Sequence, residues 1–422
     1  GVWDVLHPGH LSLLKEAKSL GDELIVSVTS DRYVNKGPGK PVFGQRERME
    51  HLLALSVVDK VVLSDHPTGA ESLEAWHPNV YIKGAEYTYE TLAVEERRVL
   101  EANGTRFHVA SWVEGESSSK IRVFGTYSDE TEAWLASFRQ RHNAGSVLAA
   151  LDSIKEMDLL IVGEHITDRY IFVDTLAKSP REHHMSTRKI KVEDYAGGVV
   201  AVRRHLKGMV ASTTVATQRE GIIKERFVEP NENRKLFSVQ QIPEALTFSK
   251  EGYSLVENPE VYDAILVLDY GHGLIREWMR ETLPQKAKFL AVNSQTNSAN
   301  YGFNLASKWP HANYRCLDGP EYNLAKASGW RPSATEHLML TKGKQGCSFY
   351  GDIPSLTVKV VDRVGAGDAL FAVTAPLVAA GVEPEIVGFI GSCAAAMQCE
   401  TVGNKTSINA GVLRKFIKRL LV

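Results

Sequence analysis

The chain has 422 residues, of which 43% are hydrophobic and 24% charged, and its formal net charge is −2 at pH 7. This length predicts two or three domains, and the composition is typical of a soluble globular protein. The small net charge argues against a general nucleic-acid or anionic-membrane partner, and no apolar run is long enough to span a bilayer. Four single cysteines without a CxxC pair favour reduced thiols in a cytoplasmic protein over structural zinc.

The first 125 residues alternate short apolar runs with segments of helical spacing. Residues 23–30, 58–64 and 79–84 are rich in Val and Ile and predict buried strands. Strands that alternate with helices predict a parallel sheet covered on both faces. Because the chain begins at Gly1 rather than Met, we expect the strand that leads into the first turn to be mostly missing.

The motif DVLHPGH, residues 4–10, holds two histidines close to the start of the chain. For this motif alone a metal site, a phosphate site and a capped turn all remain open. Zinc-binding histidine pairs on helices usually have HxxxH spacing, whereas His7 and His10 enclose a Pro-Gly pair. The free N–H groups and the dipole of a helix N-terminus attract anions, and Gly9 lets an anion approach the backbone. The motif therefore favours phosphate, with the two imidazoles as additional donors.

Further candidate anion-binding residues follow in the same region. Lys36 and Arg46 belong to a basic, Gly/Pro-rich loop that leads into a helical segment, and Lys83 ends a predicted strand. Three consecutive hydroxyl residues, Ser117, Ser118 and Ser119, precede a predicted helix start. Each feature alone is as consistent with an ordinary surface loop, so their order along the chain decides the interpretation.

This order of motifs resembles that of cytidylyltransferase-like nucleotidyltransferases over about residues 1–125. Their G-x-F-D, HxGH, K-G-x-D-Y and S-S/T-T-x-I patterns correspond to residues 1–4, 7–10, 83–87 and 117–121, with Trp3 and Glu86 as departures. The resemblance implies that His7 and His10 act on a triphosphate, ATP or CTP, whose α-phosphorus is attacked by a sugar phosphate while pyrophosphate leaves. It also implies a set of nucleotide-binding residues: Gly9, Lys36, Arg46, Lys83, Ser117, Ser118 and Ser119.

A change of pattern then marks a second region. Residues 128–157 are polar and helical and predict a connector or a pair of helices between domains at 1–127 and 158–422. The α/β rhythm restarts at residues 158–170, and residues 188–244 combine short β-like pieces and turns that predict a small lid sheet. Later strands are expected at residues 264–270, 288–294 and 337–343.

The motif GAGD is the strongest local signal of the chain. Gly365, Ala366 and Gly367 form a turn that opens a helical segment, where backbone N–H groups can bind an anion. Asp368 follows directly and could accept a proton from a hydroxyl that attacks the γ-phosphate of ATP. The alternative is a helix cap after a glycine turn.

With its companions, GAGD resembles the ribokinase-like, PfkB-type sugar kinases over roughly residues 158–422. The resemblance implies an α/β fold with a small β lid, Mg²⁺ and ATP as cofactors, and Asp368 as the catalytic base. Asp168, Gly197 and Gly198 would then bind the sugar. Lys224 and Arg226 would reach a substrate phosphate, unless they are exposed charges of the lid. On the nucleotide side the matching residues are Thr341, Gly343 and Gly346.

The sequence departs from this kinase pattern in three places. The usual Asn after the glycine pair is absent, and Asp318 with Glu321 replaces the magnesium-side N-x-x-E motif at the same i, i+3 spacing. A loop at residues 292–304, which includes Asn293 and Asn297, stands where a shorter Lys-bearing loop is usual. Its amide side chains suggest hydrogen bonds to a polyol substrate, and a turn-rich loop without such a role is an equal alternative.

A sugar kinase joined to an HxGH nucleotidyltransferase resembles the bifunctional ADP-heptose synthases. The resemblance implies phosphorylation of a heptose 7-phosphate at O1, adenylyl transfer to a heptose 1-phosphate, and a homodimer. In that family the kinase comes first, whereas here the nucleotidyltransferase leads, so another sugar or CTP remains open. Two alternatives stand beside this hypothesis: a cytidylyltransferase for a polyol phosphate with a kinase of different substrate, and a chain with one catalytically silent domain.

Overall fold

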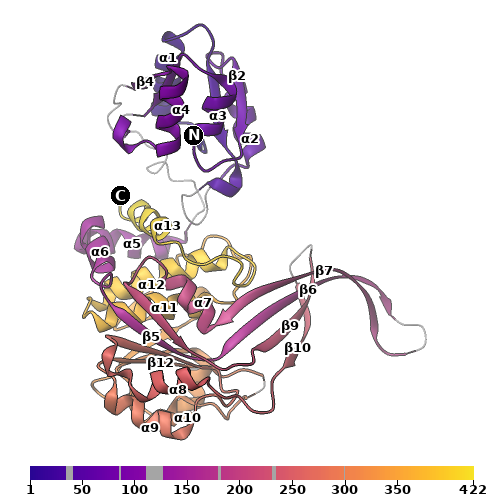
Figure 1. The fold of residues 1–422 in the computed structure, drawn as a ribbon, viewed down its shortest axis with the longest axis vertical. Coiled ribbons are helices and arrows are strands. Elements are labelled where there is room, and N and C mark those ends of the chain that lie inside the picture. Colours follow the sequence, from indigo (N-terminus) through magenta and orange to yellow (C-terminus); the bar gives the residue numbers. More distant parts are fainter. Residues whose placement is uncertain (35–40, 85–86, 111–126, 179–181, 231–233, 299) are drawn as a thin grey trace. The chain divides into compact units, whose positions relative to one another are not determined.

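The computed structural model describes residues 1–34, 41–84, 87–110, 127–178, 182–230, 234–298 and 300–422 (Figure 1). The chain divides into two compact units, residues 1–126 and residues 127–421. Both are built from parallel strands and helices, so the predicted α/β class is confirmed. Lys36 and the serines Ser117, Ser118 and Ser119 lie outside the described residues.

The described residues of the first unit form four α-helices and four short strands. The helices are α1 (Pro8–Ser19), α2 (Gln45–Leu53), α3 (Ala70–Trp76) and α4 (Val94–Asn103). Strand β1 (Ile25–Thr29) pairs in parallel with β2 (Lys60–Ser64), and β3 (Val80–Lys83) pairs in parallel with β4 (Arg106–Val109). Val26 and Val28 alternate with less buried neighbours along β1 and pack into the core against Leu14 and Leu52 of the helices.

The second unit is centred on an eight-stranded sheet. Its strand order is β16-β15-β14-β13-β12-β11-β5-β8, parallel from β14 to β8 and antiparallel at the β15–β16 edge. All six residues of β11 are buried, because helices cover both faces of a parallel sheet. The strands are β5 (Asp158–Gly163), β8 (Ser212–Ala216), β11 (Ala264–Asp269), β12 (Leu290–Ser294), β13 (Tyr314–Asp318), β14 (His337–Thr341), β15 (Cys347–Ser348) and β16 (Asp352–Ile353).

Nine α-helices accompany this sheet in the described part of the second unit. Helices α5 and α6 occupy the region that the sequence assigns to a connector, yet Leu135 and Phe138 of α5 belong to the main core of this unit. Asn143 separates the two helices because its side chain caps α6 by accepting a bond from Ser146. The nine are α5 (Asp129–Arg141), α6 (Ala144–Asp152), α7 (Val199–Leu206), α8 (Lys250–Glu257), α9 (Glu277–Lys286), α10 (Gly319–Ala327), α11 (Ala366–Ala379), α12 (Pro384–Cys399) and α13 (Ala410–Leu420).

A second, four-stranded sheet projects from this unit as a lid (Figure 1). Its order is β10-β9-β6-β7, with β6 (His165–Lys178), β7 (Met185–Gly198), β9 (Ile222–Glu229) and β10 (Arg234–Gln241). The lid begins earlier than the sequence predicts, because residues 158–170, an apolar run followed by mostly polar residues, divide between the two sheets. Gly163 ends β5 there, and a Cβ at this position would lie 2.2 Å from the Leu268 carbonyl oxygen.

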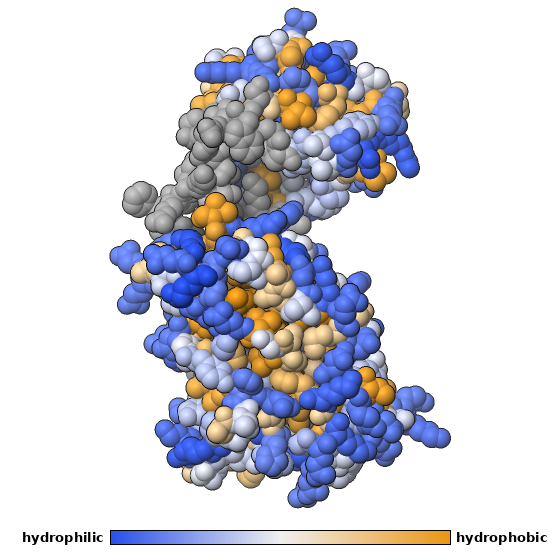
Figure 2. All heavy atoms as spheres, turned by 90° about the vertical axis from the view of Figure 1, so that its left-hand side faces the viewer, coloured by the Kyte–Doolittle hydropathy of each residue, from blue (hydrophilic) through white to orange (hydrophobic). Residues whose placement is uncertain are grey.

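On the face that Figure 2 turns to the viewer, hydrophilic residues predominate, and the second unit shows an apolar area. The four cysteines are buried, and none forms a disulfide. In the described part of the chain, no helix has the length and apolar character needed to cross a membrane.

Candidate active sites

The candidate kinase site lies at one edge of the eight-stranded sheet. Parallel strands place their carboxyl ends along a common edge, which is where α/β proteins bind ligands. Polar residues stand at or just after the ends of five successive strands here. They are Glu164 after β5, Tyr270 after β11, Gln295 after β12, Asp318 at the end of β13 and Thr341 at the end of β14.

Asp368 lies in the first turn of α11, whose N-cap is Gly365. Its Oδ1 atom accepts hydrogen bonds from the Tyr270 hydroxyl at 3.1 Å and the Gln295 amide at 3.0 Å. Oδ2 has no hydrogen-bond partner among the described residues. Burial raises the pKa of Asp368 to about 6, and the charge of Asp168 adds to this, while the bonds from Tyr270 and Gln295 oppose it. Asp368 is therefore ionised at neutral pH yet close to its titration range, as a general base requires.

We expect the kcat of phosphoryl transfer to rise with pH and to reach half of its plateau near pH 6, because only ionised Asp368 accepts a proton. ADP release between about pH 5 and pH 8 measures this profile. In a Tyr270→Phe variant the midpoint should move to higher pH, since the lost hydrogen bond lowers the pKa of Asp368. An unmoved midpoint would assign the titration to another group.

The candidate acceptor residues come from the base of the lid. Asp168 on β6 is buried and accepts a 2.5 Å bond from Arg226 on β9, and Lys224 is the register partner of Asp168. Gly197 and Gly198 end β7 beside them. Gly198 has a φ of +57°, and a Cβ there would lie 2.1 Å from the Glu164 carbonyl oxygen, so only glycine fits. The structure thus brings together all five predicted acceptor residues of the lid.

Two groups in this site were not identified from the sequence. Glu164 is fully buried and accepts bonds from the backbone N–H groups of Tyr270 and His272. Both ring nitrogens of His272 are buried without a hydrogen-bond partner in the described structure, and burial together with the nearby Lys224 charge lowers the pKa of His272 to about 4. The only sequence signal for either residue is its position just after a buried strand.

The amide-rich loop after β12 folds back on the protein. Asn293 donates to the Cys316 carbonyl at 2.8 Å, and Asn297 and Asn300 donate to the Tyr270 carbonyl at 2.8 and 2.6 Å. Asn304 donates to the Asp269 carbonyl at 2.8 Å. Asn297, Asn300 and Asn304 hold the end of β11 in place, which corresponds to the turn-rich loop that the sequence left as one possibility. Asn293 lies within β12 and ties that strand to β13 instead.

The candidate nucleotide residues follow β14 and precede α11. Thr341 ends β14, and Gly343 and Gly346 bound the short turn after it, both with positive φ. Gly365 has a φ of +84°, and a Cβ there would lie 2.1 Å from Asn404 Oδ1. Ala366 and Gly367 form the first residues of α11, where backbone N–H groups have no acceptor within the helix.

Asp318 and Glu321 form a capping box at the start of α10. Asp318 accepts a bond from the Glu321 N–H at 2.7 Å, and the two Glu321 oxygens accept bonds from the N–H groups of Asp318 and Thr296 at 2.8 and 3.0 Å. The capping box therefore accounts for the i, i+3 spacing of Asp318 and Glu321. Burial and the Asp318 charge raise the pKa of Glu321 to about 7. Two carboxyl groups held together in this way suit Mg²⁺, which prefers oxygen ligands and would offset their repulsion.

The candidate nucleotidyltransferase site lies at the start of α1. His7 is the N-cap residue, Pro8 and Gly9 begin the helix, and the rings of His7 and His10 lie 3.8 Å apart between centroids. Asp4, also buried, accepts bonds from the N–H groups of Val42 and Phe43 and ties the turn to the loop before α2. The arrangement places two imidazoles beside the N–H groups of a helix start, as phosphate binding requires.

The basic residues of this unit lie in different surroundings. Arg46 is exposed and pairs with Glu50 at 3.1 Å along α2. Arg48 is instead fully buried and donates to the carbonyls of Val2, Phe43 and Thr29 and to the Asp31 carboxylate, which fixes the loops around the turn.

Lys83 ends β3, where its ammonium lies 3.4 Å from the buried Glu96 and 4.8 Å from the Tyr87 ring centroid. Glu96 also accepts bonds from the Gly69 N–H and the Tyr81 hydroxyl. Lys83 therefore has a structural ion pair at the end of β3.

Comparison with known proteins gives matches in both units. Residues 1–124 match the cytidylyltransferase-like family, and residues 311–410 match the pfkB family of carbohydrate kinases. Over 123 residues the chain is 38% identical to a bifunctional protein HldE from Koribacter versatilis and 41% identical to one from Caulobacter vibrioides. Each match covers 29% of this chain and 25% of the relative, so the chain matches about a quarter of the length of these curated proteins.

Solved structures give lower similarity over a larger part of the chain. One match is a nucleoside kinase of the ribokinase family from Methanocaldococcus jannaschii. The match spans 62% of this chain and 98% of that kinase, with 17% identity and a TM-score of 0.46. Another match is an Arabidopsis thaliana ribokinase complexed with ribose and ATP. It spans 63% of this chain and 99% of that ribokinase, with 14% identity and a TM-score of 0.43. From the two family matches, the chain joins a cytidylyltransferase-like domain to a pfkB carbohydrate kinase domain.

Proposed function

We propose that the chain is a bifunctional transferase that phosphorylates a sugar and joins a nucleotidyl group to a sugar 1-phosphate. The observation that carries the proposal is the presence in one chain of Asp368 at the start of α11 and of His7 with His10 at the start of α1. The bifunctional HldE relatives and the pfkB match support it. The proposed product is ADP-glycero-manno-heptose or a closely similar nucleotide sugar.

In the kinase reaction, a heptose 7-phosphate is proposed to lie between the base of the lid and Asp368. Its O1 hydroxyl gives its proton to Asp368 Oδ2, the oxygen bonds to the γ-phosphorus of ATP, and the bond from that phosphorus to ADP breaks. Asp168, Gly197 and Gly198 would position the sugar, and Lys224 and Arg226 would bind its phosphate. Burial lowers the pKa of Lys224, and this ammonium has no hydrogen-bond partner among the described residues, so a ligand phosphate can supply one.

The nucleotide would lie along the other half of the same edge. Thr341, Gly343, Gly346 and the turn formed by Gly365, Ala366 and Gly367 are the proposed contacts to ATP. Asp318 and Glu321 would hold Mg²⁺, which neutralises phosphate charge when bound. Because the amides of Asn293 and Asn297 are bonded to the protein backbone, their proposed role is to shape the acceptor pocket.

In the nucleotidyl transfer, a phosphate oxygen of heptose 1-phosphate is proposed to attack the α-phosphorus of ATP as pyrophosphate leaves. His7, His10 and the helix start at Gly9 would stabilise the charge that develops on the phosphates. Lys83 would exchange its bond to Glu96 for a phosphate contact. Lys36, Arg46, Ser117, Ser118 and Ser119 remain proposed nucleotide contacts.

Phosphorus NMR of the full chain tests both activities. One sample contains Mg²⁺, ATP and heptose 7-phosphate, and a second contains heptose 1-phosphate with ATP or with CTP. A new anomeric phosphate in the first and a diphosphate linkage in the second support the proposal and identify the base. ADP formation without any diphosphate linkage would restrict the function to the kinase, and a linkage with CTP alone would favour a cytidylyltransferase.

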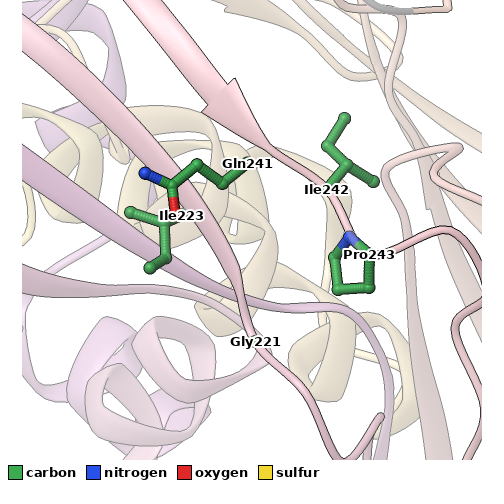
Figure 3. Close-up of a pocket in the computed structure, with 5 residues that line it drawn as sticks. All are labelled: Gly221, Ile223, Gln241, Ile242 and Pro243. Atoms are coloured by element: carbon green, nitrogen blue, oxygen red, sulfur yellow. The ribbon is translucent and has the colours of Figure 1, made fainter.

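We further propose that the chain acts in the cytoplasm as a homodimer, with a second copy covering the outer face of the lid. On this face Val192, Ile171, Phe227 and Phe237 are consecutive register partners across the sheet, and the rings of the two phenylalanines stack at 4.3 Å. A cavity of about 230 Å³ lies farther along the same face, between the ends of β9 and β10 (Figure 3). Covering these apolar groups is a reason for two copies to associate.

A Phe237→Asp substitution should shift the chain from dimer to monomer, because it places a charge within the proposed interface. Light scattering after size exclusion measures the mass. Phe303→Asp provides the control, since Phe303 is also an exposed phenylalanine, 78% against 53% for Phe237, but lies outside the lid. A wild-type chain that is monomeric at micromolar concentration would contradict the proposal.

A further inference from the structure

Asp362 is a buried carboxylate, 5% exposed, that lies three residues before Gly365. Four hydrogen bonds converge on it. The Tyr170 hydroxyl and the Lys235 ammonium each donate at 2.6 Å, and the N–H groups of Gly403 and Val364 donate at 3.0 and 3.2 Å. The catalytic scheme above gives this residue no role.

Two of these donors belong to the lid. Tyr170 lies two residues after Asp168 on β6, so both side chains are on the same face of the sheet, and Lys235 lies on β10. The Arg226 guanidinium, which binds Asp168, lies 6.0 Å from the Tyr170 ring centroid, and the Lys235 ammonium lies 5.9 Å from it. Asp362 therefore receives its lid contacts directly beside the pair that would grip the acceptor.

The other two donors lie in two chain segments beside the turn that would bind phosphate. Val364 directly precedes Gly365, and Gly403 directly precedes Asn404. Gly365 and Asn404 lie so close that a Cβ on the glycine would be 2.1 Å from Asn404 Oδ1. By holding both N–H groups, Asp362 fixes the two chain segments that meet at the start of α11.

The charges make this arrangement depend on the position of the lid. Burial by itself would raise the pKa of Asp362, but the bonds from Lys235 and Tyr170 hold it below its ordinary value. Burial and the bond to Asp362 raise the pKa of Tyr170, so its hydroxyl remains a donor. If the lid moves away, Asp362 loses its only ion-pair partner among the described residues while it stays bonded to the turn. An unpaired buried carboxylate is costly, so the free energy of moving the lid depends on how the turn holds Asp362.

We propose that Asp362, through Lys235 and Tyr170, is a positioning residue that couples the position of the lid to the conformation of the phosphate-binding turn. Nucleotide bound at the turn would then order the lid strands before the sugar arrives, and sugar bound at the lid would order the turn. The coupling rests on the kinase activity proposed above, because it presumes that a nucleotide phosphate occupies the turn.

Hydrogen exchange, followed by mass spectrometry on the full chain with Mg²⁺ and β,γ-imido-ATP, tests this coupling without a sugar. In the wild type we expect slower exchange at residues 363–369 and, through Asp362, exchange at least about fivefold slower in β9 and β10, the lower end of ordinary coupling between sites. In Lys235→Met the turn should still be protected while the response of the lid disappears. Lys235→Arg should restore it, since the charge is kept.

Arg188→Met is the matched control, because it removes another lid cation whose 2.7 Å ion pair with Asp174 does not involve the turn. This variant should keep the response of the lid. If Lys235→Met fails to fold, which faster exchange throughout β11–β14 would reveal, Tyr170→Phe takes its place as the variant that should lose the response.

Two results would overturn the coupling: a wild-type lid that does not respond although the turn is protected, or an undiminished response in Lys235→Met or in its replacement. Absence of protection at the turn in the wild type would instead overturn the kinase assignment and, with it, the coupling.

Discussion

An Asp368→Asn variant should lose between about 10² and 10⁴ in the kcat of phosphoryl transfer, the usual contribution of a general base. The amide keeps the shape of the side chain and can still accept the bonds from Tyr270 and Gln295 through its oxygen. It cannot take the proton of the acceptor hydroxyl. The KM for ATP should change little, because the proposed nucleotide contacts are backbone groups and residues after β14. Coupled measurement of ADP release gives both parameters.

The nucleotidyl transfer of the same variant provides its internal control. Asp368 belongs to the second unit and the histidine turn to the first, so Asp368→Asn should leave diphosphate formation from a sugar 1-phosphate unchanged. Gln295→Glu is a stricter comparison, because it replaces a donor to Asp368 with a second carboxyl group and should raise the pH midpoint rather than abolish the reaction. A kcat within about threefold of wild type in Asp368→Asn would remove Asp368 from the role of base.

Features that depend on neighbours in sequence could be predicted. The turn before Asp368, the helix start at Gly9 and the alternation of strands with helices each follow from local spacing. The capping box of Asp318 and Glu321 is equally local, and for that reason its spacing alone does not separate a helix cap from a metal site.

Features that depend on the fold as a whole could not be predicted. Arg48 and Arg46 are two residues apart on one basic segment, yet the first is fully buried and the second is exposed. Asp362 receives its lid contacts from residues 192 and 127 positions away. Only the assembled structure shows which charge of a segment has a buried partner, because that depends on the tertiary packing of distant strands.

The division of the run at residues 158–170 has a similar cause. The run reads as one strand because a single glycine, Gly163, separates the apolar residues of β5 from β6, in which buried Ile166, Asp168 and Tyr170 alternate with less buried residues. The close approach of Gly163 to Leu268 belongs to the register of β5 with β11, which the sequence of one strand does not contain. This division decides where Asp168 lies: it belongs to the lid sheet and moves with it, rather than with the strand edge that carries Tyr270.

A His10→Ala variant should lower the kcat of nucleotidyl transfer by about 10² to 10³, the usual cost of one donor that stabilises transition-state charge. His10 is the better choice than His7, because the His7 side chain is more deeply buried, so its loss would also leave a space in the packing around the helix start. Pyrophosphate release from ATP and heptose 1-phosphate measures the rate, and ADP release in the kinase reaction should not change.

His108→Ala is the matched control for this variant, because His108 contacts α1 through Glu16 at 2.9 Å and not through the turn. If the histidine turn holds the triphosphate, His108→Ala should retain most of its nucleotidyl transfer while His10→Ala does not. Equal losses in the two variants would mean that the position of α1 matters and that the imidazole of His10 does not. A His10→Ala variant with normal transfer would exclude the HPGH motif as the phosphate site and leave it as a capped turn.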